Sequence, residues 1–216
     1  MIITTFATGI IDAIGYLGFD KIFTANMTGN VIVLGMGLSG SDELPVAGPL
    51  IALISFTLGA ATAGLCLRKV RGGWTAPICA MFLAETVLLG LVGVLLMLAP
   101  PQIGSPAMHA FTFALAFLLG AQAAAARKVG VKDVTTVVVT STITSLAAES
   151  WSANTTVAQT LRRIGAVAAL SAGAVCGGLL HYYGADYGDA YGVLATACGI
   201  AVVTGLGAKR LRDLRR

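Results

Sequence analysis

Long apolar stretches, separated by short polar segments, are the feature that most constrains the fold of this chain. Several run for about 18 residues or more, the length that marks a helix able to cross the hydrocarbon core of a bilayer. Only 11% of the residues are charged and 56% are hydrophobic, whereas soluble domains carry about a quarter charged residues. We therefore predict an all-α integral membrane protein, with a single membrane domain over residues 1–216.

The apolar pattern predicts about six transmembrane helices, half of them on each side of a proline-rich turn near residue 100. We expect a first repeat over residues 1–100, a second over 105–208, and a basic cytoplasmic tail over 209–216. The expected spans are residues 2–18, 48–67, 75–98, 107–126, 164–182 and 188–207.

Two polar segments in matching places indicate an internal duplication. Residues 18–34 (GFDKIFTANMTGNVIVL) align without gaps on residues 130–146 (GVKDVTTVVVTSTITSL). The apolar stretch after the first cluster, residues 31–38, is too short to cross the membrane as a helix, which favours a broken or re-entrant half-helix after the first span of each half. The matched polar pairs are Thr24 with Thr136, Thr28 with Thr140, and Asn30 with Thr142.

The basic residues predict the orientation. If both polar segments are re-entrant and the N- and C-termini are cytoplasmic, every lysine and arginine except Lys21 faces the cytoplasm, as the positive-inside rule requires. An odd number of crossings in each half then turns the second repeat upside down relative to the first. Inverted repeats of this kind are typical of transporters, whose sites lie near mid-membrane where broken helices meet.

The two polar segments predict a binding site for a small polar or anionic solute. A helix start offers free N–H groups and a partial positive charge, and neutral side chains replace part of a solute's hydration shell. The alternative is a non-transporting membrane scaffold or assembly protein, in which the same groups cap and bridge helices. The predicted substrate-binding residues are Thr24, Asn26, Thr28, Asn30, Thr136, Thr140, Thr142 and Gln122.

Two carboxylates within the apolar spans are candidates for proton coupling. Asp12 lies in the first span and Glu85 in the third, and an ionisable side chain in a membrane helix is a functional candidate by default. The alignment brings Asp12 within two residues of Gln122, so the two could flank one cavity from opposite halves. The alternative for Asp12 is a hydrogen bond to the backbone at a helix kink, and the alternative for Glu85 is a protonated, structural side chain.

Other classes of function find little support. The chain has no HExxH, GxSxG, P-loop or Rossmann motif, so we expect no enzyme, with intramembrane catalysis by Asp12 and Glu85 as a remaining alternative. The four cysteines have no CxxC spacing, and we predict no metal and no cofactor. The expected partners are the lipid bilayer and the solute, not nucleic acid. The glycine- and alanine-rich face at residues 59–64 is open to two interpretations, packing within one subunit or in a homo-oligomer.

The sequence also resembles a known family. Residues 9–35 (GIIDAIGYLGFDKIFTANMTGNVIVLG) closely resemble the bacterial YoaK-like membrane proteins, whose function is unknown. Residues 120–146 (GAQAAAARKVGVKDVTTVVVTSTITSL) resemble the second signature of that family. The resemblance extends over nearly the whole chain. It implies a multi-pass protein of the bacterial inner membrane with about six spans, and it supplies neither a substrate nor a catalytic residue.

Overall fold

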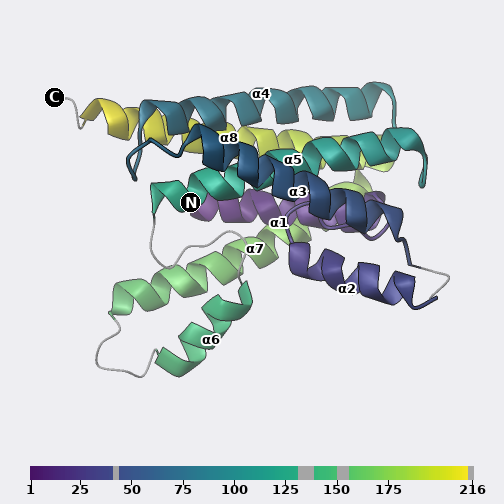
Figure 1. Cartoon of the computed structure of the whole chain (residues 1–216), viewed down its shortest axis with the longest axis horizontal. Helices are drawn as coiled ribbons and strands as arrows, with labels where there is room; N and C mark the ends of the chain where they lie inside the picture. Colours follow the sequence, from purple (N-terminus) through teal and green to yellow (C-terminus); the bar gives the residue numbers. More distant parts are fainter. Residues whose placement is uncertain (41–43, 131–138, 150–155, 214–216) are drawn as a thin grey trace.

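The computed structural model describes residues 1–40, 44–130, 139–149 and 156–213, and within these ranges all regular secondary structure is helical. The two short helices α2 and α6 lie to one side of the bundle formed by the longer ones (Figure 1). The helices are α1 (Ile2–Gly18), α2 (Met27–Leu38), α3 (Ala47–Cys66), α4 (Ala76–Leu98), α5 (Pro106–Val129), α6 (Val139–Glu149), α7 (Val157–Tyr183), the 3-10 turn η1 (Ala185–Tyr187) and α8 (Gly188–Asp213).

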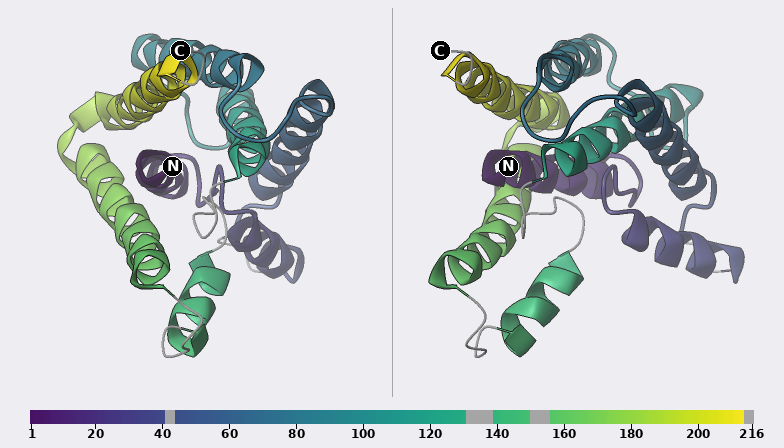
Figure 2. Two further views of the ribbon diagram at one scale, coloured as in Figure 1. Left: turned by 90° about the vertical axis from the view of Figure 1, so that its left-hand side faces the viewer. Right: turned by 60° about the vertical axis from the view of Figure 1, so that its left-hand side comes forward.

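The prediction of an all-α membrane protein is confirmed in its general form. Among the described helices, α3, α4, α5, α7 and α8 together with η1 are long and apolar enough to cross a membrane. The first predicted span forms α1, which has 17 residues and a length of about 25 Å at 1.5 Å per residue. α1 is therefore shorter than the other five, and the end-on view shows it inside the curve that they form (left view of Figure 2).

One predicted boundary was wrong. The polar linker expected before the fifth span is partly helical, because α7 begins at Val157 and not near residue 164. A capping box starts the helix: the Gln159 N–H donates to the Thr156 hydroxyl at 3.3 Å, and the Thr156 N–H donates to the Gln159 side-chain oxygen at 2.9 Å. Roughly two additional turns, at about 3.6 residues per turn, bring Arg163 inside the helix.

Helix pairs that are distant in the sequence make up the bundle. α1 packs on α7 and α8, α3 packs on α5, and α4 packs on both α8 and α5, while α2 contacts α3 and α6 contacts α7. The core between them is mainly apolar. Its largest side chains include Ile11, Ile14, Phe82, Leu115 and Ile200.

Two glycines set the crossing of α3 and α5. A Cβ added at Gly59 would overlap the carbonyl group of Phe117, and a Cβ added at Gly120 would overlap the carbonyl group of Phe56. Small residues of this kind let two membrane helices approach until their backbones touch. Gly59 therefore packs within the subunit, whereas nothing lies within 4 Å of a Cβ added at Gly64.

The same reciprocal arrangement occurs where α1 crosses α7. A Cβ at Gly173 would overlap the carbonyl group of Phe6, and a Cβ at Gly9 would overlap the carbonyl oxygen of Leu170. In both crossings each helix contributes one glycine, and each glycine faces the backbone of the partner helix. Both contacts are therefore backbone to backbone, and they leave no room for a larger side chain.

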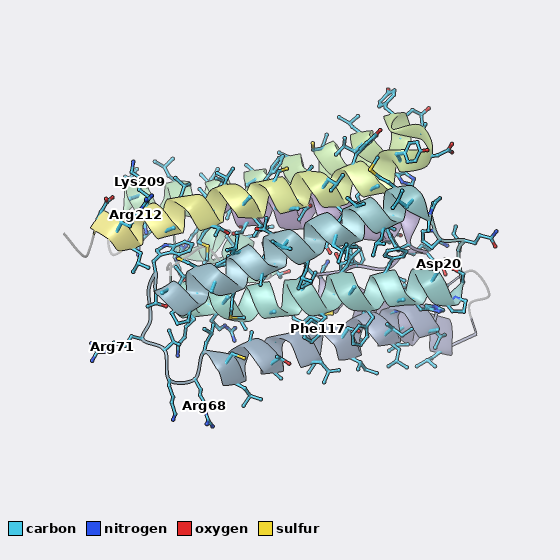
Figure 3. The ribbon with its side chains drawn as sticks, turned by 90° about the horizontal axis from the view of Figure 1, so that it is seen from above. Asp20, Arg68, Arg71, Phe117, Lys209 and Arg212 are labelled. Carbon is cyan, nitrogen blue, oxygen red and sulfur yellow. The ribbon has the colours of Figure 1, made fainter. Side chains whose placement is uncertain are left out.

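Charged residues separate toward the two ends of the bundle (Figure 3). Arg68, Arg71, Lys209 and Arg212 lie at one end, and Asp20 lies at the other. The loop that carries Arg71 joins the C-terminal end of α5 through a hydrogen bond of 3.1 Å from the Gly73 N–H to the Lys128 carbonyl. We call the end that holds these basic residues the basic end.

Candidate polar site at the start of the short helices

The segment between α1 and α2 turns back along α1. Asp20 and Lys21 both have a φ of 60°, and this left-handed conformation reverses the chain after α1. The Ile22 N–H then donates to the Gly15 carbonyl at 3.3 Å, and the Ala25 N–H donates to Asp12 Oδ1 at 2.7 Å. The segment therefore descends beside α1 by about 9 Å, since a helix rises 1.5 Å per residue. α2 starts at that depth and not at the end of the bundle.

Asp12 anchors this descending segment. Its Oδ1 accepts the N–H groups of Thr24 at 2.9 Å and Ala25 at 2.7 Å, together with the Thr24 hydroxyl at 3.2 Å. The carboxylate thus satisfies backbone groups that no helix or strand satisfies, which is a requirement for irregular backbone inside a membrane. Thr24 is 1% exposed, so its hydroxyl belongs to this anchor.

Asn30 joins the descending segment to α2. Its Oδ1 accepts the Phe23 N–H at 2.9 Å, and its Nδ2 donates to the Phe23 carbonyl at 2.6 Å. One amide side chain therefore satisfies both backbone groups of Phe23, and Asn30 is completely buried. Asn30 is a predicted solute ligand, but in the structure its side chain bonds both backbone groups of Phe23 and so ties the start of α2 to the segment before it.

Asn26 and Thr28 lie at the exposed start of α2. Asn26 is the N-cap, and its side chain accepts the Gly29 N–H at 3.3 Å. The side chains of both residues are exposed, in contrast to Thr24 and Asn30. Among the predicted ligands of the first half, these two are the ones that the fold leaves accessible.

In the second half, the predicted ligands are distributed over α6 and the segment before it. Thr140 is exposed in the first turn of α6, and Thr142 is buried. Thr136 lies outside the described residues. The prediction that the two clusters face each other therefore stays a prediction, although the N-terminal ends of α2 and α6 are their near ends in the views of Figures 1 and 2.

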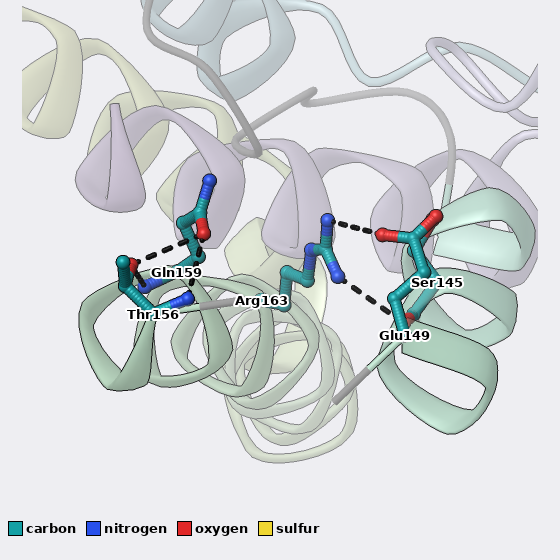
Figure 4. A network of polar contacts seen from close by, with 5 residues as sticks. All are labelled: Ser145, Glu149, Thr156, Gln159 and Arg163. Atoms are coloured by element: carbon teal, nitrogen blue, oxygen red, sulfur yellow. Dashed lines mark hydrogen bonds and ion pairs between the residues drawn. The ribbon is translucent and has the colours of Figure 1, made fainter. Parts of the chain in front are cut away.

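Arg163 of α7 holds the C-terminal part of α6. Its guanidinium group donates to the Ser145 carbonyl at 3.1 Å and pairs with a Glu149 carboxylate oxygen at 2.8 Å (Figure 4). The sequence predicts that Arg163 faces the cytoplasm, and the structure adds that the residue is only 8% exposed. The capping-box pattern of Thr156 and Gln159 was the signal that could have found it, because it extends the helix through this position.

We expect Arg163→Ala to loosen α6 far more than Glu149→Gln. The alanine variant removes both the part-buried bond to the Ser145 carbonyl and the pair with Glu149, and a hydrogen bond from a charged group contributes about 1.5–3 kcal/mol. Glu149→Gln keeps the bond to Ser145 and removes the charge of a side chain that is 52% exposed, at a cost of at most about 1 kcal/mol. Limited proteolysis near residues 145–149 measures the difference. Equal cleavage of the two variants would show that the arginine does not hold the helix.

Gln122 and Glu85 form a separate buried pair. Gln122 Nε2 of α5 donates to Glu85 Oε1 of α4 at 2.7 Å, and the two residues are 4% and 5% exposed. Asp12 bonds instead to the segment before α2. The structure therefore brings Gln122 to Glu85, and it does not bring Gln122 into contact with the side chain of Asp12.

These features define a polytopic α-helical membrane protein with a polar segment that folds back along α1. The chain belongs to the DUF1275 family of proteins of unknown function, whose model matches residues 1–206. It is 32% identical over 139 residues to the transmembrane protein YoaK of Bacillus subtilis (strain 168), a match that covers 64% of this chain and 60% of YoaK. No solved structure matches the chain. The resemblance to YoaK-like proteins is thereby confirmed.

Proposed function

We propose that this protein is a transporter or channel for a small polar solute, whose path passes the starts of α2 and α6. The observation that carries the proposal is the descending segment that ends at Asp12, since it brings the polar start of α2 beside the middle of α1. Irregular backbone at membrane depth occurs where it is buried in protein or lines a water-filled cavity. Asn26 and Thr28 are exposed there, which favours the cavity.

An inverted repeat of three spans in each half is part of the proposal. The alignment that matches the two polar segments also matches the first residues of α2 and α6, Met27 and Val139. The two glycine crossings support the same relation, because α1 packs on α7 in the way that α5 packs on α3. A bundle built from two such halves has its pseudo-symmetry axis in the membrane plane, where transporter sites lie.

The anchoring role of Asp12 bears on the kind of solute. Its carboxylate oxygen already accepts the N–H groups of Thr24 and Ala25, which an anion would otherwise use. A carboxylate at this position also repels a second negative charge. We therefore favour a neutral or cationic polar solute over an anionic one, with Asp12 and Glu85 as the groups that could couple its movement to protons.

The scaffold alternative has an observation of its own. Asn30 and Gln122 are buried, and each bonds a partner within the chain, Phe23 and Glu85 respectively. Polar pairs of this kind stabilise membrane helix packing without any solute, each by about 0.5–2 kcal/mol. On this alternative the membrane protein holds an assembly together, and no solute crosses it.

The decisive experiment measures solute flux in variants that keep the fold. Thr28 and Thr140 are exposed, so Thr28→Val and Thr140→Val remove a hydroxyl without disturbing the core. We expect each to lower flux about two- to tenfold, the equivalent of one hydrogen bond. Swelling of proteoliposomes in glycerol, urea and guanidinium solutions provides the measurement.

The matched control is Thr62→Val on α3, where the exposed hydroxyl bonds to the carbonyl of Leu58 in its own helix at 2.8 Å. This variant should keep wild-type flux. If all three variants fold and none of the solutes crosses in the wild type, the transport proposal fails and the scaffold remains.

A further inference from the structure

A second feature, separate from the short helices, is a cavity of about 190 Å³ at the basic end of the bundle. It lies between the start of α1, the last turns of α8 and the loop before α4. None of its lining residues belongs to the polar site described above. The lining residues are Met1, Ile3, Trp74, Val203, Leu206, Gly207 and Arg210.

Trp74 forms one wall and is held in place by two helices. A Cβ at Gly207 would overlap the indole ring, so α8 presents a glycine where the ring lies against it. On its other side the indole contacts Phe82 of α4, with ring centroids 5.8 Å apart. Tryptophan is enriched at the boundary between hydrocarbon and headgroups, and we expect that boundary here, at the ends of α1, α4 and α8.

The walls differ in chemistry along the cavity. Ile3, Val203 and Leu206 are apolar, and Leu206 is 56% exposed on α8, so the cavity continues onto the apolar outer surface of that span. Arg210 is the one lining residue with a charged side chain, and Arg71 and Lys209 lie at the same end of the bundle (Figure 3). No carboxylate belongs to the lining, so the cavity pairs an apolar wall with a positive rim.

We propose that this cavity binds an anionic phospholipid. The acyl chain packs against Ile3, Val203 and Leu206, Trp74 lies at the level of the glycerol backbone, and the phosphate pairs with Arg210. Basic pockets between membrane helices on the cytoplasmic side bind anionic headgroups in this way. The continuity of the apolar wall with the lipid-facing side of α8 favours a lipid over a soluble anion, because a free phosphate gains nothing from an apolar wall.

The test compares two lipids that differ only in headgroup charge. The full-length protein, purified and delipidated in detergent, is titrated with phosphatidylglycerol or phosphatidylcholine of identical acyl chains, and bound lipid is counted by native mass spectrometry. We expect phosphatidylglycerol to bind more tightly, and Arg210→Gln to weaken it about fivefold while leaving phosphatidylcholine unchanged. Arg210→Lys should retain most of the preference. Arg68→Gln, at the same end but outside the cavity, should retain all of it.

Several results would overturn the proposal. Equal affinity for the two lipids would show that the headgroup charge plays no role. If Arg68→Gln weakened phosphatidylglycerol binding as much as Arg210→Gln, the preference would come from the summed positive charge of the basic end and not from the cavity. Displacement of the lipid by free glycerol phosphate would show a soluble anion site. A change of oligomeric state in Arg210→Gln, without a change in lipid binding, would assign the cavity to a second copy of the chain. Thermal unfolding of each variant checks that the fold is intact.

Discussion

Gly59→Leu is expected to prevent stable folding. The Cβ of any larger residue at this position would overlap the carbonyl group of Phe117, a backbone atom that cannot rotate away. α3 and α5 would have to separate, and because Gly120 makes the reciprocal contact with Phe56, both contacts would be lost together. Overpacking a core typically costs 1–3 kcal/mol, and we expect at least about 3 kcal/mol here because the obstacle is backbone.

Gly64→Leu is the matched control, since it makes the same change in the same helix. Nothing lies within 4 Å of a Cβ at Gly64, which is exposed. We expect its folded yield and unfolding temperature in detergent, measured by fluorescence-detected size exclusion, to match the wild type. If the two leucine variants behaved alike, the close crossing of α3 and α5 would be incorrect.

Asp12→Ala is expected to release the descending segment from α1. The substitution removes the acceptor of the Thr24 N–H, the Ala25 N–H and the Thr24 hydroxyl. A buried donor left without an acceptor costs about 1–3 kcal/mol, so the loss of three amounts to roughly 3 kcal/mol or more. A lower unfolding temperature, together with faster hydrogen exchange at residues 24 and 25, would measure the effect.

Asp12→Asn separates anchoring from charge. The asparagine oxygen can still accept the same donors, so we expect its unfolding temperature to lie much closer to the wild type than that of Asp12→Ala. If Asp12 also couples solute movement to protons, Asp12→Asn should fold and yet lose the dependence of flux on a pH gradient. Equal stability of the alanine and asparagine variants would contradict the anchoring role.

The sequence predicted the elements of the fold better than the contacts between them. The polar cluster before α2 and its match before α6 located two short helices, because a polar segment that interrupts an apolar chain can be recognised from the sequence alone. α1 was also placed correctly, although it is too short for a span by length alone. The start of α7 was missed because the apolar pattern begins after Arg163, while the capping box lies before it.

The structure divides the predicted site residues by accessibility. Thr28 and Thr140 are exposed and stay candidates for solute contact, but Asn30 bonds the backbone of Phe23 in the manner of a clamp. The Gln122–Glu85 pair joins two helices whose neighbours cannot be read from periodicity. Tertiary contacts decide which polar groups stay accessible and which form hydrogen bonds within the chain. For that reason the list of site residues could be drawn from the sequence, but their separate roles could not.

The reactivity of a cysteine at Thr28 tests the central claim most directly. Single cysteines are introduced as Thr28→Cys or Thr140→Cys into a variant whose four native cysteines are replaced. Intact membrane vesicles that contain each variant are then treated with a small charged thiol reagent. The control is Val87→Cys, because Val87 is 62% exposed in the middle of α4, where we expect it to face lipid. If the starts of α2 and α6 line a water-filled cavity, the two threonine positions react and the valine position does not. If Thr28→Cys and Thr140→Cys proved as unreactive as Val87→Cys, the result would contradict a hydrated path through this protein.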